Sequence, residues 1–294
     1  AKDTADLNIL FIGNSYTHMN EMPKLFGKLA KAKGYAVNVE MNTQSGASFK
    51  VHTGRPDMWK KINSKPWDYV VLQGYSRELS HPVSKIDSET LPFVRQIIDS
   101  IQLNNPCTQV LLYMTWGYKN GFLEREEVDS YQKMTDKIAS GYRHLSDTLQ
   151  LPLVPVGQVW KEVRTQYPAI ELYDADLAHP SKKGSYLTAC AFYAAIFKEN
   201  PKGLITSSIE AEYAYRLQDL AGTYVLNNYK TYKLNMNRID VKSVTTVDNK
   251  YLIFTKSNFP NSNGIVWDFG DGQISTDVNP VSYTHLRAHE TKPN

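Results

Sequence analysis

The sequence predicts an α/β protein in which helices cover both faces of a parallel sheet. Segments of strand and helix character alternate through about residue 200, which is typical of this class. The strand segments are short and apolar, and 294 residues are enough for one large domain and a small one. The five predicted strands are residues 8–12, 36–41, 69–72, 109–113 and 153–156.

The first strand is the clearest, and a sharp turn follows it. Four consecutive apolar residues, Ile9 to Ile12, indicate a strand buried on both faces of the sheet. The turn Gly13-Asn14-Ser15 then leads to a predicted helix over 22–33. Ser15 should therefore lie beside a helix N-terminus, where free N–H groups and the helix dipole stabilise negative charge. It can act there as a nucleophile, or it only caps the helix.

The other predicted helices cover residues 88–103, 128–148, 159–167, 183–197 and about 209–225. Ligands of such sheets bind at the carboxyl ends of the strands, so the loops there should converge. A polar connection at 227–237 precedes short predicted strands at 238–247, 251–256 and 264–269. We place a domain boundary near residue 235, which gives domains 1–234 and 235–294.

Composition excludes several classes of function. The 33 basic and 30 acidic residues leave a net charge of +3 without any basic run, so nucleic-acid binding has little support. No apolar run approaches the roughly 20 residues that span a membrane. Cys107 and Cys190 match no metal-ligand spacing and are expected to be buried, small apolar residues. We expect neither a metal nor an organic cofactor.

One of the seven histidines has the neighbour that a catalytic base needs. Asp176 precedes His179 by three positions, a spacing at which one turn brings carboxylate and imidazole together. Pro180 restricts the backbone directly after the histidine. The hypothesis is a Ser-His-Asp arrangement; the alternative is a solvated loop in which the two residues occur by chance.

Gly13-Asn14-Ser15 together with Asp176-x-x-His179 resembles the SGNH (GDSL-type) hydrolase superfamily, over roughly residues 7–200. The family usually carries Gly-Asp-Ser, so Asn14 is a variation. The resemblance implies a flavodoxin-like, three-layer α/β/α fold with a five-stranded parallel sheet. It also implies that Ser15 is the nucleophile, that His179 is the general base and then acid, and that Asp176 orients His179.

The same resemblance implies donors for an oxyanion. Gly46, in a loop after the second strand, matches a family glycine whose N–H acts together with that of the nucleophile, Ser15; the alternative is a plain turn glycine. The family's third block, Gly-x-Asn-Asp, is absent. The sequence here is Gln73-Gly74-Tyr75-Ser76, which is similar to carbohydrate-esterase branches of the superfamily. The Gln73 amide is the favoured replacement donor, and the Ser76 hydroxyl is the alternative.

The loop after the fourth strand, 114–118, should lie on the same rim. Its aromatic residues suit the faces of sugars, so Trp116, with Asn14, is a predicted substrate contact; the alternative is that Trp116 belongs to the core. Near the C-terminus, residues 265–272 resemble the signature of PKD-like β-sandwich modules, cut short after Tyr283. Such modules are common in extracellular proteins that process polysaccharides, so we expect a secreted, periplasmic or cell-surface location. We assign no function to His285 or His289.

These features favour a serine esterase that removes short acyl groups, acetyl above all, from carbohydrates or other small esters. Two alternatives stay open. A flavodoxin-like sheet could bind phosphate or flavin at the helix N-terminus after its first strand. A relic hydrolase fold could instead serve a non-catalytic carbohydrate-binding or adhesion protein.

Overall fold

The computed structural model describes residues 6–204 and 209–235, and the backbone of the strands 241–247, 251–256, 267–268, 274–275 and 281–282. The chain divides into two compact units, Ala1–Asn237 and Arg238–Asn294. Each unit is described by itself.

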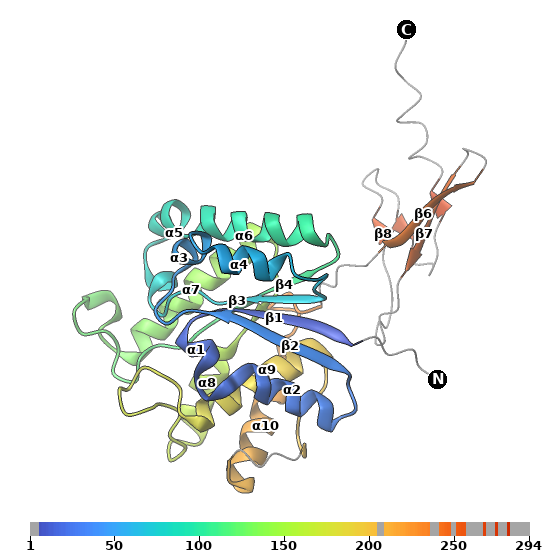
Figure 1. Ribbon diagram of the computed structural model, residues 1–294. Helices are drawn as coiled ribbons and strands as arrows, with labels where there is room; N and C mark the ends of the chain where they lie inside the picture. Colours follow the sequence, from blue (N-terminus) through green and yellow to red (C-terminus); the bar gives the residue numbers. More distant parts are fainter. Residues whose placement is uncertain are drawn as a thin grey trace. The chain divides into compact units, whose positions relative to one another are not determined.

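The first unit is built on a five-stranded parallel sheet with the strand order β2-β1-β3-β4-β5. The strands are β1 (Leu7–Gly13), β2 (Val37–Thr43), β3 (Tyr69–Leu72), β4 (Gln109–Tyr113) and β5 (Leu153–Val154). Figure 1 shows helices on both faces of this sheet, so the predicted α/β class with five parallel strands is confirmed.

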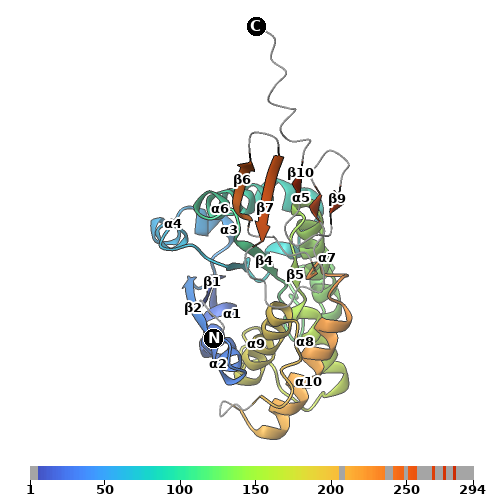
Figure 2. The same ribbon diagram turned by 90° about the vertical axis from the view of Figure 1, so that its right-hand side faces the viewer.

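Helices α3 to α6 lie over one face of the sheet, and α2, α8, α9 and α10 lie over the other (Figures 1 and 2). The elements are α1 (Ser15–His18), η1 (Met19–Glu21), α2 (Met22–Ala32), α3 (Phe49–Thr53), α4 (Pro56–Ile62), η2 (Glu78–Ser80), α5 (Val83–Glu89), α6 (Leu91–Asn104), η3 (Glu126–Val128), α7 (Tyr131–Leu149), α8 (Val156–Gln166), α9 (Lys182–Phe197) and α10 (Ala211–Asn227).

Strand β1 lies inside the sheet between β2 and β3, and the side chains from Ile9 to Ile12 are fully buried. Phe11, for example, packs edge-on against Phe26 of α2 and Phe192 of α9. The prediction of a strand buried on both faces is therefore confirmed. Because β1 is held on both edges, the turn that follows it starts from a rigid platform.

The fifth strand and the helix predicted over 88–103 differ from the prediction in ways that have a clear cause. The fifth strand ends at Val154 rather than 156, because Pro155 precedes a helix that already begins at Val156. The helix predicted over 88–103 is two helices that meet at Thr90, with Pro92 in the first turn of the second. The short helices α3 and α4 were not predicted. Of the two cysteines, Cys190 is buried and Cys107 is partly exposed.

In the second unit, β6 (Val241–Val247), β7 (Tyr251–Lys256) and β10 (Val281–Ser282) form an antiparallel sheet in the order β10-β7-β6. Strand β8 (Trp267–Asp268) pairs antiparallel with β9 (Ile274–Ser275). The signature residues 269–272 lie outside the described residues, as do His285 and His289. The PKD-like module therefore stays a prediction.

Candidate active site

The structure brings Ser15, His179 and Asp176 together although the serine and the histidine lie 164 positions apart. The Ser15 Oγ atom lies 2.8 Å from His179 Nε2, at hydrogen-bond distance. On the other side of the ring, His179 Nδ1 is hydrogen-bonded to Asp176 Oδ2. This is the order of contacts in which an imidazole can take a proton from a hydroxyl while a carboxylate holds the ring.

The turn that carries Asp176 and His179 is closed by its own backbone. Asp176 Oδ1 accepts hydrogen bonds from the N–H groups of Ala178 (3.0 Å) and His179 (2.9 Å). Leu177 between them has φ +60°, a left-handed conformation that leucine rarely adopts. Its carbonyl accepts from the Lys119 N–H at 2.8 Å, and this contact helps to hold the conformation.

Asn14, and not Ser15, caps helix α1. The Asn14 side chain accepts from the Tyr16 N–H, and its Nδ2 donates to the carbonyls of Ala47 and Gly74, both at 3.3 Å. The alternative that Ser15 only caps the helix is therefore wrong. Asn14 also lines the pocket, although its amide already joins three loops of the protein, so a contact between Asn14 and substrate stays a prediction.

Gln73 lies behind the nucleophile turn and does not reach the pocket. It is fully buried, its Oε1 accepts from the Asn14 N–H (2.9 Å) and the Thr17 hydroxyl (2.8 Å), and its Nε2 donates to the Gly74 carbonyl. The prediction that its amide donates to an oxyanion is therefore wrong. Gly13 makes room for these contacts, because a Cβ there would come within 2.5 Å of Gln73 Oε1.

Trp116 belongs to the core and supports the His179 loop from beneath. It is fully buried and stacks between Tyr16 (4.6 Å between centroids) and Trp160 (3.8 Å), so the prediction that it contacts substrate is wrong. Its indole N–H donates to the Ala178 carbonyl at 3.1 Å. Tyr16 in turn packs edge-on against the His179 ring at 5.5 Å. The aromatic stack thus contacts the His179 ring through Tyr16 and the preceding residue, Ala178, through Trp116.

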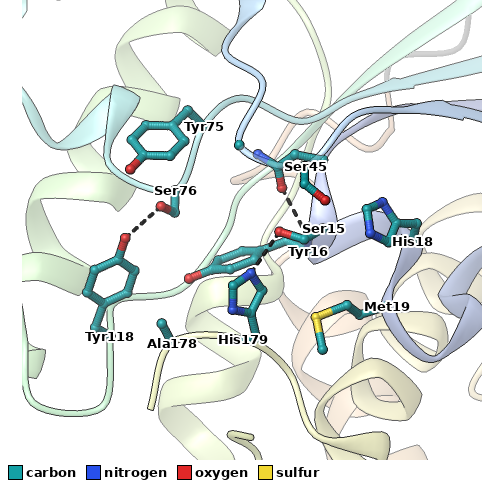
Figure 3. Close-up of a pocket in the computed structure, with 12 residues that line it drawn as sticks. Ser15, Tyr16, His18, Met19, Ser45, Tyr75, Ser76, Tyr118, Ala178 and His179 are labelled. Carbon is teal, nitrogen blue, oxygen red and sulfur yellow. Dashed lines mark hydrogen bonds between the residues drawn. The ribbon is translucent and has the colours of Figure 1, made fainter. Parts of the chain in front are cut away.

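Ser15 and His179 line a pocket with a volume of about 410 Å³, within the usual size of a small-molecule site (Figure 3). Loops that follow β1 to β4, together with the His179 loop, form its wall. The lining residues are Asn14, Ser15, Tyr16, His18, Met19, Ser45, Gly46, Tyr75, Ser76, Tyr118, Ala178 and His179. The convergence of loops at the carboxyl ends of the strands is the arrangement that the fold class predicts.

Two of the predicted oxyanion donors besides Ser15 are on this wall. Gly46 has φ +69°, in the left-handed region, and no atom lies within 4 Å of the place where a Cβ would be. Gly46 is exposed and lines the pocket, so its backbone is accessible. The Ser76 hydroxyl lies 2.8 Å from the Tyr118 hydroxyl, and a dashed line in Figure 3 marks this hydrogen bond. Donation to an oxyanion from Gly46 and Ser76 stays a prediction.

The surroundings of the pocket residues favour an ionised Asp176 and a neutral His18. Partial burial raises the pKa of Asp176, but hydrogen bonds from the His179 ring and from two backbone N–H groups outweigh it and hold the pKa below its usual value. Burial, followed by the nearby His179, lowers the pKa of His18. Negative charge is thus kept beside Nδ1, and His18 adds no positive charge near neutral pH.

Sequence reasoning did not single out Met19 or Ser45 as pocket residues, nor the individual roles of Tyr75 and Tyr118. Their position directly after predicted strands is the signal that could have found them, since such loops share one rim. Within residues 6–204 and 209–235, no group of three or more His, Cys, Asp or Glu could hold a metal ion. No helix of these described segments is long and apolar enough to cross a membrane.

No family model and no curated protein matches the chain. Solved structures do resemble it. A DUF4886 family protein from Bacteroides uniformis has a TM-score of 0.65 and 19% identity over 76% of this chain and 95% of its own. A Slackia heliotrinireducens protein assigned to the SGNH hydrolases has a TM-score of 0.52 and 24% identity, and the match covers 64% of this chain and 98% of that one.

An acetyl xylan esterase is similar to the same extent, with a TM-score of 0.52 and 18% identity over 65% of this chain and all (100%) of its own. With all three identities below 25%, the structural likeness shows a shared fold. The chain therefore has the three-layer fold found in SGNH hydrolases and acetyl xylan esterases.

Proposed function

We propose that this protein is a serine esterase that hydrolyses short acyl esters, most fittingly acetyl esters of carbohydrates. The observation that carries the proposal is the 2.8 Å contact between Ser15 Oγ and His179 Nε2, with Asp176 on the far side of the ring and all three beside a pocket. The fold shared with an acetyl xylan esterase supports the proposed substrate class.

The reaction would run through an acyl-enzyme. His179 Nε2 takes the Ser15 proton while Oγ attacks the ester carbonyl, and the imidazolium is stabilised by Asp176. The N–H groups of Ser15 and Gly46 and the Ser76 hydroxyl are the proposed donors to the oxyanion. His179 then protonates the departing alcohol, and the same base activates the water that releases the acid. The rings of Tyr75 and Tyr118 offer apolar faces to a sugar.

The test is the Ser15→Ala variant assayed with p-nitrophenyl acetate and with acetylated xylo-oligosaccharides. Turnover should fall by roughly a thousandfold or more, because the nucleophile is gone while binding groups remain. Ser88→Ala on α5 removes a hydroxyl away from the pocket and serves as the control. A fluorophosphonate should label wild type and not Ser15→Ala. Undiminished turnover in folded Ser15→Ala would rule out the proposal. Sugar binding without any turnover by wild type would support the non-catalytic alternative.

A further inference from the structure

Arg77 is a fixed cation beside the pocket. Its guanidinium carbon lies 3.9 Å from the centre of the Phe122 ring and 5.4 Å from that of Tyr75. Its Nη2 also donates to the Tyr75 hydroxyl at 2.8 Å. Two aromatic rings and a hydrogen bond therefore hold the side chain in place, and most of its conformational freedom is already lost before any ligand binds.

In the part of the chain that the structure describes, no carboxylate oxygen lies within 4.0 Å of the Arg77 side-chain nitrogens. The neighbouring acids are turned elsewhere. Glu78 points inward and accepts from the Tyr75 and Phe49 N–H groups. On the same rim, Lys119 is paired with Glu171 and Arg125 with Glu127. Arg77 thus differs from these cations because its charge is not neutralised within the protein.

The position of Arg77 relates it to the proposed chemistry. Tyr75 and Ser76 line the pocket, and Figure 3 shows the Tyr75 hydroxyl directed away from Ser15. Since Arg77 is bonded to that hydroxyl, it lies at the far end of the Tyr75 ring from the nucleophile. Consider a ligand whose ester lies at Ser15 and whose remaining part extends along Tyr75 and Tyr118. The far end of this ligand would lie close to the Arg77 guanidinium.

We infer that Arg77 binds the carboxylate of an acidic sugar, so that the substrate class is the acylated uronic-acid saccharides. This inference rests on the proposed esterase function. Rings already pack on the guanidinium, so a partner must approach its remaining N–H groups from the edge. A planar carboxylate binds a guanidinium edge with two parallel hydrogen bonds, and this geometry favours it over a neutral hydroxyl.

The experiment compares two matched esters, an O-acetylated methyl glucuronoside and the O-acetylated methyl glucoside with the acetyl group at the same position. Wild type should have the higher kcat/KM for the glucuronoside, through a lower KM, and the preference should shrink as salt is raised. In Arg77→Gln the ratio of the two kcat/KM values should fall by about 10- to 100-fold, the usual effect of a lost charge-assisted pair. Arg77→Lys should lie between.

Arg95→Gln, on α6, removes the same charge at an exposed position outside the pocket and should leave the ratio as in wild type. An equal loss on both esters in Arg77→Gln would mean that Arg77 only supports the Tyr75 ring, and would overturn the inference. The inference would also be overturned if the wild-type enzyme hydrolysed p-nitrophenyl acetate but neither sugar ester. The same holds if it hydrolysed the glucuronoside and the glucoside equally well. Failure on p-nitrophenyl acetate itself would instead count against the esterase function.

Discussion

The side-chain amide of Asn20 donates to the carbonyl of Pro180 at 3.0 Å, and this bond ties the segment after the nucleophile to the loop that carries His179. The same Nδ2 donates to the Ser185 hydroxyl at 3.0 Å, and that hydroxyl donates back to the Met19 carbonyl. Asn20 has φ +53°, a left-handed conformation that asparagine tolerates better than most residues. It thus links the segments that carry Ser15 and His179, the two side chains of the proposed proton transfer, without touching either.

Asn20→Gly should therefore lower kcat by about 10-fold and change KM little, because a small displacement between Ser15 and His179 weakens proton transfer. Glycine keeps the left-handed backbone, so this variant isolates the lost hydrogen bonds. Asn20→Ala should show the same kcat and an additional loss of about 1 kcal/mol in unfolding free energy from backbone strain. Steady-state kinetics and denaturant unfolding measure both quantities. A wild-type kcat in Asn20→Gly would contradict the assigned role.

Trp116→Phe should lower kcat by roughly 10-fold, because the ring stack survives but the hydrogen bond to the Ala178 carbonyl is lost. The matched control is Trp160→Phe. It replaces the other indole of the stack with a smaller ring and leaves the hydrogen bond from Trp116 to Ala178 in place. The two variants should lose comparable stability, and only Trp116→Phe should lose most of its turnover. Equal kcat values in the two variants would show that the stack, and not the hydrogen bond, positions the loop.

The side chains of the proposed triad could be brought together from the sequence, whereas the residues that support them could not. Asp176 and His179 are three residues apart, so local geometry suffices to pair them, and Ser15 follows a run of apolar residues that only a buried strand explains. Gln73 was assigned to the wrong side of its loop, because the direction of its amide depends on Asn14 and Thr17, far away in sequence. Trp116 and Tyr118 occupy one loop with similar chemistry, and only the packing decides which ring faces the pocket.

Asp176→Asn should lower kcat by about 100- to 10,000-fold with little loss of stability. The asparagine Oδ1 can still accept from the Ala178 and His179 N–H groups, so the turn should persist. Its amide, however, would donate to His179 Nδ1 and drive the ring proton to Nε2, the atom that must accept from Ser15. Activity on p-nitrophenyl acetate tests the expected fall in kcat, and thermal unfolding tests the expected small loss of stability. Near wild-type kcat would show that Asp176 does not set the tautomer.

Glu78 should make the protein less stable as pH rises from about 4.5 to 7. Its burial raises its pKa from 4.5 to about 7, and hydrogen bonds from Tyr75, Phe49 and Thr90 offset this only in part. Between these two pH values the folded protein binds more protons at this site than the unfolded chain. The stability that this carboxyl contributes is therefore fully present below pH 4.5 and is lost as pH rises through the folded pKa, by about 3 kcal/mol in all.

Glu78→Gln removes the titration while keeping the size of the side chain, so the difference in unfolding free energy between variant and wild type isolates this group. The unfolding free energy of the variant minus that of wild type should increase by about 3 kcal/mol between pH 4.5 and 8, whatever its value at pH 4.5. Urea unfolding at several pH values measures it. Glu124→Gln removes one carboxyl at an exposed position and serves as the control for the change in net charge. A flat difference for Glu78→Gln would mean that the carboxyl is ionised in the folded protein at acidic pH, and that the N–H groups of Tyr75 and Phe49 compensate its burial.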